Sequence, residues 1–475
     1  MPGRRVRTLA RRILGSSPSA PVGLRARGGG LDDYVAHGAV ELGLRIGEAM
    51  LSLGAPAADV TGAIQRVVGA FGLAGCHVEV TFTAITVSYD RGLGASPLTL
   101  MRVVGERVPD YRRLAGVFAL ADSLRGPIPR TEATARLEET HSTLDEVVSA
   151  PRPYGRWVVT VMLSVLAAAV AFLLGGGPPV ALAAGLTTAL VDRVTWALGR
   201  WGLPPFFVQA AGAGLASLVA VGLFLVVPVL PFELAMLPPS LVVASGVVVL
   251  LAGLSLVGAA EDAISGFPVT AGARTFEVLV LTLGIVVGIG GVLDVARRLG
   301  VPLEIIDVPR NTSPVAVQIA AAAVVALAWA GASYAGLRAA GLAALAGGTA
   351  WSVFALMRDL GLGPAVASAA AALVIGLLGE SVGRRIGVPS IVTSVCGIIP
   401  LLPGLGVYRG LFLVINEQGG GGFVEGAAVL LGAAMVGLGL AGGVTLGEFL
   451  AAPRRGGRRR RRPPGRVPRS VPRAR

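Results

Sequence analysis

Long apolar stretches follow one another from about Trp157 to Phe449, and no other feature of the sequence restricts the fold as strongly. A helix needs about 20 apolar residues to cross the hydrocarbon core of a bilayer. Hydrocarbon offers the backbone no hydrogen-bond partner, so stretches of this length must be helical. The mean hydropathy of +0.73 and the charged fraction of only 15% agree with this reading. The sequence therefore predicts a polytopic α-helical membrane protein.

Proline pairs and polar links divide these stretches into about ten predicted transmembrane helices. Arginine gathers at one set of helix ends, for example at Arg193, Arg200 and Arg274, although the loop over residues 294–314 also carries three arginines. Because cytoplasmic loops are rich in arginine, we expect both termini in the cytoplasm. The helices are predicted at about 157–174, 179–198, 206–227, 240–260, 274–293, 315–335, 338–357, 363–382, 388–407 and 424–449.

Two membrane segments resemble each other. PSLVVASGVVVLLAGLSLVG (239–258) and PSIVTSVCGIIPLLPG (389–404) both begin with Pro-Ser and end with Gly, and a Glu-x6-Gly pattern follows each of them. They form the fourth predicted helix of each half. Because five is an odd number, the second copy of a five-helix unit enters the bilayer from the side opposite to the first. The similarity therefore predicts two five-helix halves of inverted topology, at 157–293 and 315–450.

Residues 35–150 read as a soluble cytoplasmic α/β domain. Apolar and polar residues alternate from Cys76 to Tyr89, which predicts two strands. Amphipathic stretches at 98–108, 110–125 and 131–148 predict helices. The three histidines and two cysteines have no ligand spacing, and no nucleophile motif occurs, so we predict no catalytic residue, metal or cofactor.

The two ends of the chain are rich in arginine. There are eleven arginines in 454–475 and seven in 1–30, with no acidic residue among them. We predict disordered ends at 1–34 and 451–475, and contact between the C-terminal tail and anionic lipids. Nucleic acid is not an expected partner, because no aromatic residues are interleaved with the arginines. A homo-oligomer is left open.

An interrupted helix marks the predicted substrate site. Pro403 and Gly404 break an apolar stretch, and a break within a membrane must line a cavity or face protein. Its free amides suit a negatively charged group of a ligand. The matching break is predicted at Gly258. The substrate-binding residues predicted around the two breaks are Thr393, Ser394, Pro403, Gly404, Tyr408 and Gly258.

Two carboxylates follow the first predicted break. Glu261 and Asp262 end an apolar span, where an acid is costly and often functional. Both are predicted proton-coupling groups, and Asp262 is preferred because it follows its break as Tyr408 follows the other. The alternative is that both lie among the lipid headgroups and balance the charge of Arg274.

Four segments together resemble the threonine/serine exporter family. They are GLRIGEAMLSLGAPAADVTGAIQRVVGAFGL, VEVTFTAITVSYD, EDAISGFPVTAGAR and IIPLLPGLGVYRG, and the resemblance runs from about residue 40 to 450. It implies ten helices and proton-driven export of small hydroxy amino acids across the plasma membrane of a bacterium. The first half departs from the pattern, because SLVGA lacks the proline of LLPGL.

Other functions remain open at this point. A related two-chain system implies export of a small dicarboxylate such as succinate. A membrane-anchored enzyme with a hydrolase-like head, or a channel or scaffold without coupling, also fits the composition. The preferred hypothesis is an exporter whose partners are a small amino acid and protons.

Overall fold

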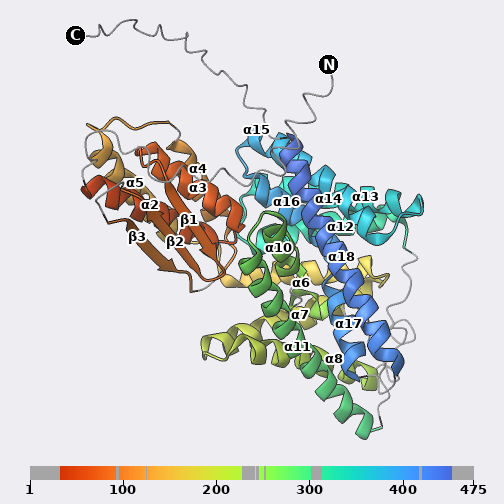
Figure 1. Ribbon diagram of the computed structural model, residues 1–475. Helices are drawn as coiled ribbons and strands as arrows, with labels where there is room; N and C mark the ends of the chain where they lie inside the picture. Colours follow the sequence, from red (N-terminus) through yellow and green to blue (C-terminus); the bar gives the residue numbers. More distant parts are fainter. Residues whose placement is uncertain are drawn as a thin grey trace, which may run out of the picture.

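The computed structural model describes residues 33–91, 96–105, 107–124, 126–226, 241, 245–250, 253–300, 313–416 and 420–451. An N-terminal domain lies beside a larger helical part (Figure 1). The predicted arginine-rich ends lie outside these ranges, apart from residues 33–34 and 451.

The N-terminal domain packs helices against a small sheet. Strands β1 (Cys76–Thr81), β2 (Ala84–Tyr89) and β3 (Leu98–Val103) form an antiparallel sheet in the order β1-β2-β3. Ile46, Ile64 and Ile85 are fully buried where helices meet the sheet. The helices are α2 (Asp33–Ser52), α3 (Ala57–Ala70), α4 (Tyr111–Ser123) and α5 (Ala133–Ser149).

The predicted elements of this domain are confirmed except at one place. The stretch 98–108 was predicted to be a helix, and this prediction is wrong, because Leu98–Val103 forms strand β3. Its side chains alternate between half-buried and exposed, the two-residue period of a strand. Pairing with β2 decides the outcome, since Leu100 lies opposite Val87.

The helical part carries the membrane spans. Among the described residues eight helices are long and apolar enough to cross a membrane, or nine if one bent pair counts as a span. The fourth predicted helix, at 240–260, lies partly outside the described residues, so the count of ten stays a prediction. The long helices are α6 (Arg156–Leu173), α7 (Pro178–Arg200), α8 (Pro205–Val226), α11 (Pro268–Arg298), α12 (Val315–Ala332), α13 (Leu337–Asp359), α14 (Pro364–Leu378) and α18 (Gly420–Ala451).

Only residues 150–155 connect the N-terminal domain to the first membrane helix, since α5 ends at Ser149 and α6 begins at Arg156. This linker is itself attached to the helical part. The Tyr154 hydroxyl donates a hydrogen bond to the carbonyl of Gly331, and its ring packs on Tyr334 with the centroids 5.2 Å apart.

Two helices of the second half touch through glycine. A Cβ on Gly443 of α18 would lie 2.4 Å from the carbonyl oxygen of Ala369 on α14, and one on Gly447 would lie 2.3 Å from that of Leu373. Small residues allow backbones to approach this closely, and van der Waals contact then holds the helices together in lipid.

We expect Gly443→Leu to lower the membrane abundance of the protein severalfold. The side chain cannot fit between α14 and α18, and overpacking of this kind costs about 1–3 kcal/mol or more. Gly432→Leu on the same helix is the control, because a Cβ there meets no atom within 4 Å. Quantitative immunoblotting of membranes measures both variants, and equal abundance would contradict the packing argument.

The second half contains the predicted broken helix. Helix α16 (Ser390–Ile398) runs through a 3-10 turn (Ile399–Leu401) into α17 (Gly404–Asn416), and the two parts meet at a bend of 46°. Pro403 cannot donate a backbone hydrogen bond, which explains why the helix stops here.

The first half is broken earlier than predicted. A 3-10 turn (Val248–Leu250) precedes helix α10 (Gly253–Ile264), so Gly258 lies inside a helix and not at a break. The prediction compared the glycines that end the two similar segments. When the segments are instead aligned from their shared Pro-Ser start, Gly253 takes the position of Pro403. A Cβ on Gly253 would lie 3.1 Å from the Cβ of Leu402 and 3.2 Å from the amide nitrogen of Gly404. Helices α10 and α17 therefore begin side by side.

Candidate functional site

A cavity of about 350 Å³ lies between the N-terminal domain and both halves of the helical part. We call it the inner cavity. Loops and helices of the domain form one wall, and α10, α11, α12, α16 and α18 form the others. Six charged residues line it: Asp59, Arg107, Glu261, Arg274, Glu277 and Glu448.

Carboxylates from four helices line this cavity. Asp59 comes from α3 of the domain, Glu261 from α10, Glu277 from α11 and Glu448 from α18. The Ser394 hydroxyl of α16 donates a hydrogen bond of 2.8 Å to Oε1 of Glu448. A cation that entered the cavity would be attracted by these groups.

Two guanidinium groups line the same cavity. Arg107 lies over the ring of Phe82, 4.1 Å from its centroid, and its Nη2 atom is buried without a hydrogen-bond partner among the described residues. Burial lowers the pKa of Arg107, and the nearby charge of Arg274 lowers it further. Positive charge is therefore concentrated here in a place where one donor is free.

The N-terminal domain is held to the helical part by polar contacts around the cavity. The amide of Ala57 donates to Oδ1 of Asp262 at 3.2 Å, and Nη1 of Arg274 lies 3.1 Å from Oδ2 of the same carboxylate. Further along, the Thr270 hydroxyl donates to the carbonyl of Val80 at 2.9 Å. Asp262 is fully buried, so its carboxylate joins the two parts of the protein.

Tyr111 makes a second set of contacts across this junction. Its amide donates to the carbonyl of Ser333 at 2.9 Å, and its hydroxyl accepts a hydrogen bond from the Trp329 indole at 3.3 Å. Trp329 and Tyr111 both line the inner cavity. The junction is thus also a wall of the cavity.

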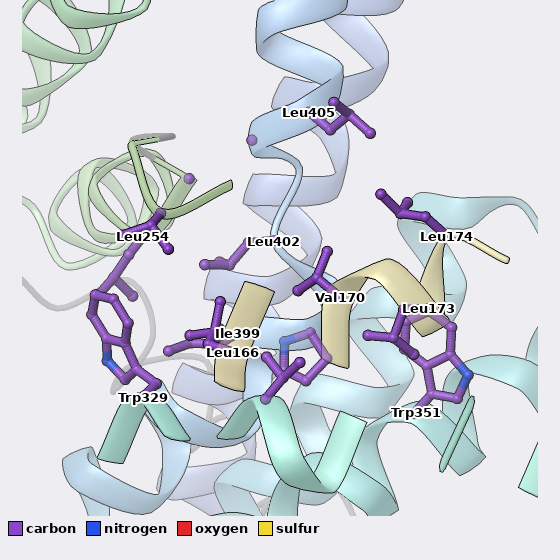
Figure 2. Close-up of a pocket in the computed structure, with 15 residues that line it drawn as sticks. Leu166, Val170, Leu173, Leu174, Leu254, Trp329, Trp351, Ile399, Leu402 and Leu405 are labelled. Atoms are coloured by element: carbon purple, nitrogen blue, oxygen red, sulfur yellow. The ribbon is translucent and has the colours of Figure 1, made fainter. Parts of the chain in front are cut away.

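An apolar chamber of about 180 Å³ lies at the two helix breaks. Gly253 and Gly404, the first residues of α10 and α17, both line it. Figure 2 shows Leu254 and Trp329 together on one side of the chamber and Trp351 on the other. Leu254 and Trp329 also line the inner cavity, so the two spaces adjoin at these side chains.

Four of the predicted site residues line one of the two spaces. Ser394, Gly258 and Glu261 line the inner cavity, and Gly404 lines the apolar chamber, directly after Pro403. The structure thus brings these residues together around two adjoining spaces.

The remaining predicted residues face elsewhere. Asp262 points into the domain junction. Thr393 is buried, and its hydroxyl has no partner among the described residues. Tyr408 packs against Phe412, with the ring centroids 5.8 Å apart, in an apolar cluster with residues of α8 and α11. These three side chains line neither space.

Sequence reasoning missed Glu448, Asp59 and Arg107. Glu448 gave a usable signal, since a carboxylate near the end of an apolar helix is costly unless it has a function. Asp59 and Arg107 gave none, because their position depends on how the domain docks. Within the described ranges no group of three or more His, Cys, Asp or Glu residues could hold a metal ion.

Comparison with known proteins identifies related sequences along most of the chain. A family described as "Putative threonine/serine exporter" matches residues 41–296, and one described as "Threonine/Serine exporter, ThrE" matches residues 318–449. The chain is 37% identical to a "Probable threonine/serine exporter" of Mycobacterium tuberculosis, over 93% of this chain and 82% of the relative. It is 36% identical to a "Threonine/serine exporter" of Corynebacterium glutamicum, over 94% and 87%. No solved structure matches the chain.

Proposed function

Because the chain belongs to the threonine/serine exporter family, we propose that it carries threonine, serine or a similarly small amino acid out of the cell. It acts as a transporter and not as an enzyme. The substrate enters the inner cavity and passes through the apolar chamber at the helix breaks.

The main structural support for this proposal is the charged lining of the inner cavity. An amino acid is a zwitterion, and a cavity that takes it out of bulk water must offer partners to both charges. The inner cavity contains arginines and carboxylates on opposing elements and adjoins the helix breaks. A dicarboxylate such as succinate fits less well, since it would meet Asp59, Glu261 and Glu448.

Efflux from cells loaded with a threonine-containing dipeptide tests the function. Peptidases release threonine inside the cell, and we expect cells that contain the protein to export it faster than cells that lack it. Succinate efflux is measured in parallel. Faster succinate efflux with unchanged threonine efflux would overturn the proposal.

The second part of the proposal is that the two halves have inverted topology. Antiparallel halves would explain why α10 and α17 begin side by side, as in transporters built from inverted repeats. Substrate would then be exposed to each side in turn as one half moves against the other.

We propose further that both termini are cytoplasmic and that the membrane is the plasma membrane of a bacterium. Asp262, Ser333 and Glu448 lie at the end of the helical part that meets the N-terminal domain, so α18 returns to the domain side. A reporter that is active only in the cytoplasm should be active when it is fused after Arg475, and a reporter that is active only outside the cell should be inactive there. Activity confined to the outside would contradict this orientation.

Proton coupling is assigned to Glu261 in preference to Asp262. Arg274 already neutralises Asp262, while Glu261 faces the cavity beside other carboxylates and has no ion pair among the described residues. A group that gains and loses a proton during transport must be accessible from the cavity while the cavity is open to at least one side of the membrane.

We expect Glu261→Gln to export threonine at a rate that no longer responds to the proton gradient. Efflux is measured with and without an ionophore that collapses this gradient while the threonine gradient is kept. Glu425→Gln is the control, because Glu425 is an exposed acid of α18. Normal gradient dependence in Glu261→Gln would show that another group carries the proton.

A further inference from the structure

The inner cavity is lined by charges of both signs. The carboxylates of Asp59, Glu261 and Glu448 form one group, whose charges interact with one another. The guanidinium groups of Arg107 and Arg274 form the other group, although Arg274 also interacts with Glu261 and is ion-paired with Asp262. The carboxylates suit an ammonium ion, and the guanidinium groups suit a carboxylate.

Each group contains one residue of the N-terminal domain. Asp59 lies in the first turn of α3, and Arg107 precedes α4. The other members, Glu261, Arg274 and Glu448, belong to helices α10, α11 and α18. The domain therefore contributes to both charged parts of a cavity whose remaining walls are membrane helices.

The free donor of Arg107 points independently to an anionic ligand. Its guanidinium is held over Phe82, yet Nη2 is buried without a partner in the part of the chain that the structure describes. A buried donor without an acceptor is costly, and a charged acceptor gives the strongest compensation. A carboxylate that binds in the inner cavity would provide it.

We infer that the N-terminal domain is part of the substrate site, with Arg107 binding the carboxylate of the amino acid and Asp59 binding its ammonium group. This inference rests on the proposed function and names the groups that recognise the substrate. The amino acid then bridges the domain and the membrane helices, since Arg274, Glu261 and Glu448 complete the two subsites. The Ser394 hydroxyl, which touches Glu448, is available to a substrate hydroxyl.

Binding to the purified full-length chain in lipid nanodiscs tests the inference. The ligands are L-threonine, L-threoninamide, which lacks the carboxylate, and N-acetyl-L-threonine, which lacks the ammonium group. We expect Arg107→Gln to weaken threonine binding on the order of ten- to one-hundredfold and to leave threoninamide binding within about twofold. Arg107→Lys should recover part of the threonine affinity, because the positive charge remains.

Asp59→Asn gives the complementary result. It should weaken threonine and threoninamide binding and leave N-acetylthreonine binding unchanged. Arg112→Gln and Glu79→Gln are matched controls, since both residues are exposed on the same domain and line neither space. Thermal unfolding of each variant shows whether the protein remains folded.

Each outcome decides the question. Failure of the wild-type protein to bind or export threonine would overturn the proposed function. If the wild type binds and exports threonine, and Arg107→Gln and Asp59→Asn bind it equally well, only the inference about the domain is wrong. An equal loss of all three ligands in either variant would likewise overturn the inference, because it would show a structural role.

Discussion

Replacing Gly253 with leucine is expected to reduce export to the level of cells that lack the protein. A Cβ at this position already comes within 3.2 Å of the Gly404 amide nitrogen and 3.1 Å of the Leu402 Cβ. The remaining atoms of leucine would enter the apolar chamber, whose volume is about 180 Å³. The substitution would push α10 away from α17 and fill the space through which we propose that substrate passes. Gly404→Leu should act in the same way from the other side.

Dipeptide-loaded efflux, corrected for membrane abundance, measures this effect. Gly222→Leu serves as the control, because Gly222 lies in a membrane helix of the same half and a Cβ there meets no atom within 4 Å. Normal export by an abundant Gly253→Leu protein would show that substrate does not pass between the two breaks.

The second large effect is expected from Asp262→Asn. Asparagine keeps an acceptor for the amide of Ala57 but removes the charge that compensates Arg274, whose side chain is only 12% exposed. Loss of one partner from a buried ion pair costs on the order of 3 kcal/mol. Without the Asp262 charge, Arg274 repels Arg107 of the domain, and the Ala57 amide loses a charged acceptor. We therefore expect the N-terminal domain to detach more often and export to fall strongly.

Limited proteolysis of the linker at residues 150–155 reports detachment, and efflux with and without the proton gradient reports coupling. Cleavage should become faster, and the residual export should still depend on the gradient. Asp294→Asn is the control, since its ion pair with Arg298 is exposed and contributes little. A firmly docked Asp262→Asn protein whose export ignores the gradient would instead identify Asp262 as the coupling group.

Many of the membrane helices could be predicted because the rule that requires them involves only residues that are close in the sequence. Backbone polar groups in lipid must pair within their own segment, so apolar length alone locates helices such as α6 and α12. The break before Gly404 was also predictable from the local sequence, since a proline inside an apolar stretch removes a backbone donor and clashes with the preceding turn. The first break has no proline, and its position at Gly253 became clear only from the structure.

Non-local contacts account for what was missed. Strand β3 depends on pairing with β2, which residues 98–108 do not encode by themselves. Ser394 and Glu261 could be chosen from the sequence because a polar group in an apolar span is unusual. Asp59 and Arg107 are ordinary charged residues of a soluble domain, and only the docking of that domain brings them to the cavity.

The short linker has a consequence for the strength of the docked state. Residues 150–155 keep the domain close to the helices, so that its effective concentration at the junction is on the order of millimolar or higher. At such a concentration the hydrogen bonds and apolar contacts of the junction hold the domain more firmly than they would hold a free one. A domain of this kind on a separate chain would lose that advantage and would need a larger contact area to stay bound.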